Sequence, residues 1–99
     1  MASFTVAANE LAVHAKTLTA ATVDTVTFSA DLDQVEVVNE DGAAAIYFTV
    51  DGSTPQVAGN NTYYLPAAIG GLQVTVPTSG NTVVKVISAG TPKYGVSAA

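Results

Sequence analysis

Histidine occurs once in the sequence, at His14, so any catalytic arrangement of the Ser-His-Asp or Cys-His kind would have to use it. Cysteine is absent, and there is no Gly-x-Ser-x-Gly segment of the kind that holds a nucleophilic serine on a sharp turn. A general base must be held within hydrogen-bond reach of the proton that it takes. Because His14 lies in the segment with the weakest periodic pattern, we expect it to bond locally or to face solvent. The sequence therefore predicts no catalytic residue.

Carboxylates gather in residues 31–36 and again in residues 39–42. Calcium takes about six to eight oxygen ligands, but neither segment has the glycine and the distal glutamate of an EF-hand loop. Asp33 and Glu36 could be compared with the paired carboxylates of a glycosidase. The sequence has no Trp and few aromatic residues to line a sugar cleft, which argues against that comparison. We expect solvated acids at the ends of a sheet, with no metal site and no cofactor.

The charge balance excludes several classes of partner. The 99 residues include 8 acids, 3 lysines and no arginine, for a net charge of −5. Binding to phosphates needs clustered cations, so we expect neither a nucleic acid nor an anionic membrane as a partner. Charged residues make up 11% of the chain, against about a quarter in a typical soluble domain. Such a surface suits lasting contact with other proteins, because little charge must be desolvated.

The first ten residues, MASFTVAANE, contain no basic segment followed by an apolar run. A secretory signal peptide needs both, so we expect none, and we expect a soluble protein that is made in the cytoplasm or released by lysis.

Alternating apolar and polar residues, rich in Val and Thr, are typical of β-strands. Gly and Pro recur at short spacing, which is typical of turns between short strands. Residues 39–43, 50–55 and 77–82 are predicted turns, and neighbouring strands are expected to pair as antiparallel hairpins. Strands are predicted at residues 25–30, 35–39, 45–50, 72–76, 82–88 and 93–97, with Tyr63 and Tyr64 in a further one.

The expected fold class is therefore all-β, a small antiparallel β-sandwich of Ig-like or jelly-roll-like type. Residues 1–99 are expected to form a single domain. We expect residues 1–20 to be an extended N-terminal arm or an edge strand, because residues 7–18 lack a helical apolar stripe and contain β-branched side chains. Phe4 and Val6 are the candidate contact residues of that arm.

Two resemblances involve the central part of the chain. The segment IYFTVDGSTP, residues 46–55, is similar to a hairpin in the small β-sandwich module found at the ends of chitobiase-like enzymes. A second resemblance covers most of residues 14–90. It consists of a Val-x-Val-x-Asn strand, an Ile-Tyr-Phe-Thr-x-Asp-Gly strand, an Asn-Thr-Tyr-x-x-Pro stretch and a Val-Lys-Val-Ile-Ser strand, in that order. In this order the chain resembles small virion proteins of tailed bacteriophages, of the capsid decoration (head accessory) type.

That second resemblance implies a structural protein without enzymatic activity. It would bind the major capsid protein on the outer surface of the phage head, as a homo-oligomer for which we favour a trimer. Tyr63 or Tyr64 would then be an exposed anchor, or an ordinary strand residue, and residues 56–61 would be a surface for a protein partner. Two alternatives stay open: a tail or head-fibre module that contacts the host surface, and a carbohydrate-associated accessory module.

Overall fold

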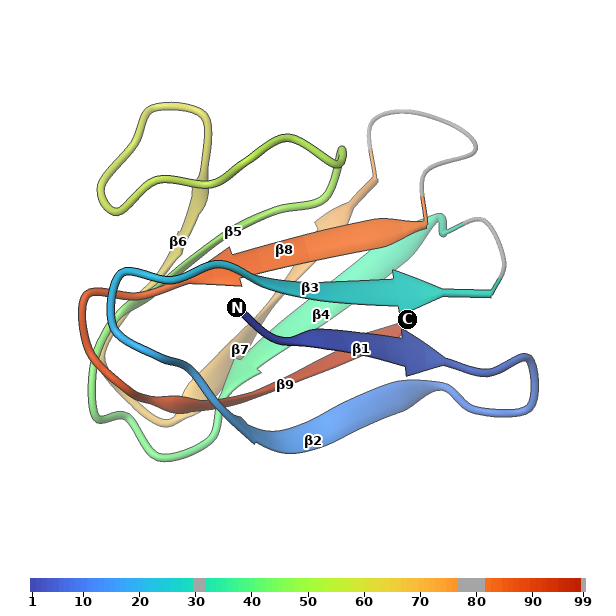
Figure 1. Ribbon diagram of the computed structural model, residues 1–99, viewed down its shortest axis with the longest axis horizontal. Helices are drawn as coiled ribbons and strands as arrows, with labels where there is room; N and C mark the ends of the chain where they lie inside the picture. Colours follow the sequence, from blue (N-terminus) through green and yellow to red (C-terminus); the bar gives the residue numbers. More distant parts are fainter. Residues whose placement is uncertain (30–31, 77–81, 99) are drawn as a thin grey trace.

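The computed structural model describes residues 1–29, 32–76 and 82–98, and these residues form two facing β-sheets (Figure 1). Among them there are nine strands and no helix, and hence no helix long and apolar enough to cross a membrane. The strands are β1 (Ser3–Val6), β2 (Ala12–Thr17), β3 (Asp24–Phe28), β4 (Gln34–Asn39), β5 (Ile46–Thr49), β6 (Tyr63–Leu65), β7 (Gly70–Thr75), β8 (Val83–Ile87) and β9 (Lys93–Ala98).

The strand order is β1-β3-β8-β5-β6 in the first sheet and β2-β9-β4-β7 in the second. The β1–β3 pair is parallel, and the other pairs are antiparallel. This arrangement confirms the predicted all-β sandwich. The predicted strands all occur, with ends that differ by one or two residues from the sequence-based bounds.

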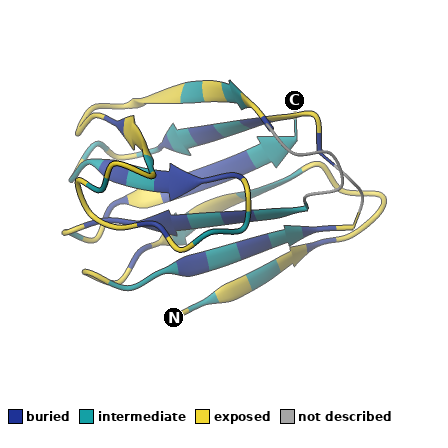
Figure 2. Ribbon diagram, turned by 90° about the horizontal axis from the view of Figure 1, so that it is seen from above, coloured by how far each residue is buried: buried dark blue, intermediate teal, exposed yellow. Residues whose placement is uncertain are grey.

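The core lies between the sheets, where alternate side chains of each strand meet. In β3 the buried apolar residues are Val26 and Phe28, and in β4 they are Val35 and Val37. Figure 2 shows this alternation as bands of buried and less buried residues along the strands. Because side chains of a strand point alternately to its two faces, one apolar face per strand is enough to build this core. The largest fully buried side chains are Val6, Leu18, Val26, Val35, Val37, Ile46, Phe48, Val50, Val84, Val86, Tyr94 and Val96.

A buried hydrogen bond joins the two sheets. The hydroxyl of Tyr94 in β9 donates to Oδ2 of Asp24 in β3 over 2.9 Å, and the backbone N–H of Ala2 donates to Oδ1 over 3.1 Å. Asp24 is 2% exposed and Tyr94 is 0% exposed. Burial, followed by the charge of Asp24 and its hydrogen bond, raises the pKa of Tyr94 far above its ordinary value, so Tyr94 stays a donor.

The predicted hairpin pairing is wrong for most of the chain. β4 and β5 follow one another but lie in different sheets, and so do β7 and β8; among the described strands, β5 and β6 are consecutive and paired. Segments of this length can close a hairpin or cross the roughly 10 Å between packed sheets. In the connection from β4 to β5, residues 40–45, the hydrogen bonds of the buried Asn39 favour a crossing to the other sheet. Its Nδ2 donates to the carbonyls of Ala44 and Pro66, and its Oδ1 accepts from the N–H of Gly42.

The first twenty residues form two strands joined by a turn, and they supply one edge strand to each sheet. β1 lies beside β3, and β2 lies beside β9. The ammonium of Lys16 in β2 lies 4.8 Å from the ring centroid of Phe4 in β1, so the two edges are held together. Whether this segment reaches a partner as an arm stays a prediction.

Candidate functional site

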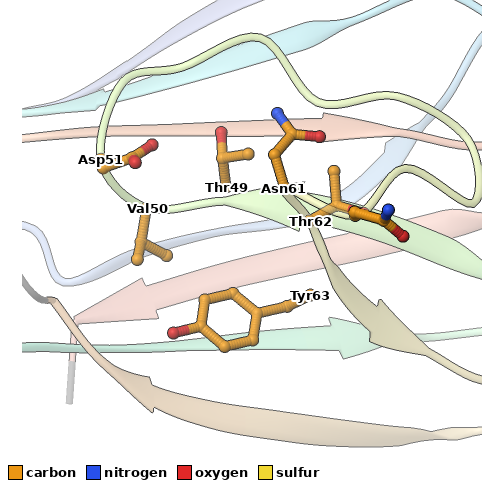
Figure 3. A pocket seen from close by; sticks show the side chains of 7 residues that line it. Thr49, Val50, Asp51, Asn61, Thr62 and Tyr63 are labelled. Atoms are coloured by element: carbon orange, nitrogen blue, oxygen red, sulfur yellow. The ribbon is translucent and has the colours of Figure 1, made fainter.

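A pocket of about 250 Å³ opens beside the long connection between β5 and β6, residues 50–62 (green to yellow in Figure 1). In Figure 3 the polar side chains of Thr49, Asp51 and Asn61 rise towards this connection, while Val50 and Tyr63 point to the opposite side. The pocket is lined by Thr49, Val50, Asp51, Asn60, Asn61, Thr62 and Tyr63. We call residues 50–62 the β5–β6 loop.

The first part of the β5–β6 loop is fixed by Asp51 and Thr49. Oδ1 of Asp51 accepts from the backbone N–H of Ser53 over 3.0 Å and from its hydroxyl over 2.5 Å. The hydroxyl of Thr49, in the last position of β5, donates to the carbonyl of Ser53 over 2.6 Å. Gly52 takes a φ of 83°, which Gly adopts without strain. The predicted turn at residues 50–55 is therefore present.

The same interactions set the charge state of Asp51. Its hydrogen bonds from the side chain and the backbone of Ser53 lower the pKa of Asp51 below its ordinary value. The carboxylate stays ionised at neutral pH, and its two hydrogen bonds from Ser53 stabilise the turn.

The later part of the loop is fixed by Asn61 and Thr62. Nδ2 of Asn61 donates to the carbonyl of Thr54 over 3.0 Å and ties the two limbs of the loop together. The hydroxyl of Thr62 donates to the carbonyl of Gly59 over 2.7 Å. Pro55, within the loop, is buried. The β5–β6 loop is thus largely exposed and still has a defined shape.

The two candidate tyrosines adjoin this loop on opposite faces of β6. Tyr63 stacks on Phe48 with ring centroids 5.4 Å apart, and Tyr64 contacts Tyr47 at the same separation in a tilted geometry. Tyr63 is 40% exposed and Tyr64 is 54% exposed. Both side chains combine a fixed position with accessible surface, as anchors of protein interfaces do.

The two candidate residues of the N-terminal arm lie elsewhere. Val6 is 1% exposed and belongs to the core, and Phe4 is half-buried beneath Lys16. An interface role for Val6 would require β1 to leave its place beside β3. The structure therefore brings Tyr63 and Tyr64 together with the loop but does not bring Phe4 or Val6 to them.

The acids and His14 do not assemble into a reactive centre in the described residues. His14 is exposed in β2, and no group of three or more His, Asp or Glu side chains that could hold a metal ion occurs in that part of the chain. Oε2 of Glu40 accepts a hydrogen bond from the N–H of Ala15 over 2.9 Å, so this carboxylate holds β2 in place. Asp31, one of the carboxylates considered above, lies outside the described residues.

No family model matches the sequence, and no curated protein matches it either. The structure matches PliG of Aeromonas hydrophila, a periplasmic inhibitor of g-type lysozyme, with a TM-score of 0.55 and 15% identity over 96% of this chain and 94% of that one. A mutant of the Escherichia coli PliG matches with a TM-score of 0.48 and 18% identity over 96% of both chains. The pre-peptidase C-terminal domain of a Bacillus anthracis collagenase matches with a TM-score of 0.48 and 15% identity over 96% and 92%. At 15% identity the likeness to the Aeromonas hydrophila protein establishes the fold alone.

The match to PliG overturns the function predicted from the sequence. The Aeromonas hydrophila protein, which this chain matches over nearly its full length, is a periplasmic lysozyme inhibitor and not a capsid protein. The predicted capsid decoration role is therefore wrong, together with the major capsid protein as partner and the outside of the virion as location. The prediction rested on strand and turn motifs, which many β-sandwiches share. The resemblance to phage virion proteins is tested by none of these comparisons and stays a prediction.

Proposed function

We propose that this chain is a non-catalytic inhibitor that binds an enzyme of the lysozyme class through the β5–β6 loop and the adjoining Tyr63 and Tyr64. The observation that carries the proposal is the loop itself, which is exposed and yet held by side-chain hydrogen bonds in both of its limbs. Support for the class of target comes from the fold, since PliG of Aeromonas hydrophila is a periplasmic inhibitor of g-type lysozyme. A periplasmic location is part of the proposal.

A preformed loop favours tight binding because less entropy is lost when the complex forms. Ordering a flexible side chain at an interface costs about 0.5–1.5 kcal/mol. Asp51, Asn61 and Thr62 already hold their partners within the free protein. The loop can therefore be recognised as a rigid body.

The chemistry of the loop suits the cleft of a glycosidase. Such enzymes use carboxyl groups that flank the bond to be cleaved, and active sites are concave. The exposed loop residues Gln56, Asn60 and Asn61 offer neutral amides, which can donate to carboxylates without bringing a like charge. Tyr64 adds an exposed aromatic ring at the rim.

A dose-response assay tests the proposal. Purified g-type lysozyme is assayed on bacterial cell walls with increasing amounts of this chain, and we expect inhibition that saturates. Asn61→Ala unties the loop and Tyr64→Ala removes the exposed ring, so each should weaken inhibition by about fivefold or more, which corresponds to about 1 kcal/mol.

Thr5→Ala is the matched control. Thr5 is exposed in β1, at the opposite edge of the sheet from β6, and this variant should inhibit as the parent does. Absence of inhibition by the parent chain would reject the proposed target. Equal losses in the control and the loop variants would reject the loop as the binding surface.

A further inference from the structure

In the part of the chain that the structure describes, the two sheets have four edge strands, namely β1 and β6 in one sheet and β2 and β7 in the other. An edge strand presents unpaired backbone N–H and carbonyl groups, to which another strand can add. Proteins block such edges with short strands, prolines, lysines or register irregularities. The four edges of this sandwich differ in how well they are blocked.

Three of the edges carry such protection. β1 is held against β2 by Lys16, which lies over the ring of Phe4. β2 has a register shift between Val13 and Lys16, where Ala15 takes a φ of 54°. β6 has three residues and is followed directly by Pro66. None of the three offers a long regular backbone to an added strand.

The fourth edge, β7, has none of these features. Its six residues, GGLQVT, contain no charge and no proline. Its pairing with β4 is unbroken from Thr75 opposite Gln34 to Gly70 opposite Asn39. Within the described residues β4 is its one strand partner, so the outward backbone groups of β7 form a regular template.

The side chains of β7 define what an added strand would meet. Leu72 and Val74 pack against the core but stay half-buried, so the inner side of this edge is incompletely covered. Residues directly opposite one another in paired strands have Cβ atoms about 5 Å apart. Apolar side chains on the inner face of an added strand would therefore cover Leu72 and Val74.

The outer side of the same edge carries a negative charge. A Cβ placed on Gly71 would lie 3.2 Å from Oε2 of Glu36, so the Glu36 carboxylate extends over the backbone of Gly71. Because Gly71 has no side chain, a long cationic side chain opposite it on an added strand can reach that carboxylate. With a net charge of −5, a second copy of this chain is a poorer match than a basic segment.

We propose that the β7 edge binds an extended segment of a partner protein as an added strand. The segment carries apolar residues at alternate positions, against Leu72 and Val74, and a Lys or Arg beside Glu36. The proposal stands on the edge geometry and does not depend on lysozyme inhibition, because the β5–β6 loop is a separate surface.

A synthetic peptide tests this proposal with the whole chain. The probe is Val-Thr-Val-Lys-Val-Thr-Val with blocked ends and a fluorescent label, and the control peptide has Glu in place of Lys. We expect saturable binding of the Lys peptide by fluorescence anisotropy, about fivefold tighter than the Glu peptide, from the usual size of cross-strand charge pairs. Amide hydrogen exchange should slow in residues 70–75 on binding.

Two protein variants make the test specific. Glu36→Gln removes the carboxylate and should abolish the preference for Lys over Glu. Gln73→Lys adds a cation at an exposed position of β7, directly opposite Glu36, without touching the core, so it should weaken the preference for Lys. Circular dichroism checks that both variants keep the fold.

Four results would overturn the proposal, and the first three concern the peptide. They are no saturable binding of the Lys peptide, binding that protects amides elsewhere than β7, and a preference for Lys that survives Glu36→Gln. Self-association of the chain alone, with protection of the β7 amides, would assign this edge to a second copy and overturn it as well.

Discussion

The buried hydrogen bond between Tyr94 and Asp24 allows one prediction to be worked out in detail. Tyr94→Phe removes one hydroxyl and keeps the ring that fills the space between the sheets. The Asp24 carboxylate, 2% exposed, would then keep the N–H of Ala2 as a partner and lose the 2.9 Å bond from Tyr94. The variant therefore isolates the contribution of one charged hydrogen bond across the sandwich.

The expected loss follows from the chemistry of that bond. Hydrogen bonds to charged groups contribute about 1.5–3 kcal/mol, and a buried acceptor left unpaired keeps its full desolvation cost. Tyr94→Phe should therefore lower the free energy of unfolding by about 2 kcal/mol. For a domain of this size, that corresponds to a fall in Tm of about 8–16 °C.

Urea denaturation followed by circular dichroism measures the change. The midpoint should fall while the slope stays the same, because the surface exposed on unfolding is unchanged. Tyr64→Phe, the same chemical change at a side chain that is 54% exposed, is the control and should change stability by less than about 0.5 kcal/mol. A loss at Tyr94 no larger than that of the control would refute the reasoning.

Three further changes test other parts of the structure. Asn39→Ala removes the side chain that bonds to the backbone of Ala44, Pro66 and Gly42. Urea denaturation should show that the free energy of unfolding falls by about 3 kcal/mol, because three hydrogen bonds disappear and buried backbone groups lose partners. A smaller fall in the free energy of unfolding than that of Tyr94→Phe would contradict this prediction. Gly42→Ala places a Cβ on a residue whose φ is 67°, and this Cβ would lie 3.2 Å from the backbone N of Ile69. The variant should lower the free energy of unfolding by about 1–2 kcal/mol in the same measurement. An unchanged stability would contradict this prediction. Asp51 should titrate below its ordinary pKa of 3.8 by carboxyl NMR, and Ser53→Ala should raise that pKa. Because the pKa of Asp51 is lower in the folded state than in the unfolded state, Asp51 stabilises the fold fully at pH values above its pKa in the unfolded chain. This stabilisation is lost as the pH falls through the pKa of Asp51 in the folded state. An Asp51 whose pKa is not lowered would contradict the prediction.

Periodicity predicted which side chains are inside but not which strands are neighbours. Val26 with Phe28, Val35 with Val37, and Val84 with Val86 were placed on shared faces, and all are buried. Alternation within a strand is local, so it can be seen in the sequence. The pairing of β4 with β7 and β9 depends on distant segments, and no local turn pattern records it.

The candidate site was predicted in part for the same reason. Tyr63 or Tyr64 was predicted to be an exposed anchor or an ordinary strand residue, and residues 56–61 a surface for a protein partner, because exposed aromatics and polar loops have recognisable compositions. Both tyrosines are exposed, and their role in binding stays a prediction. The roles of Asn61 and Thr62 were missed. Their partners are the carbonyls of Thr54 and Gly59, which come into reach only when the loop has folded. Every residue has a backbone carbonyl, so the residue types along the chain do not show which carbonyl will accept a side-chain hydrogen bond.

A backbone amide NMR titration of this chain with unlabelled g-type lysozyme tests most directly whether the β5–β6 loop and β6 bind a lysozyme-type enzyme, as proposed. We expect shift changes or line broadening that concentrate in residues 50–64, with little change in β1 or β2. Absence of any change at saturating enzyme, or changes confined to strands away from the loop, would reject the proposed binding.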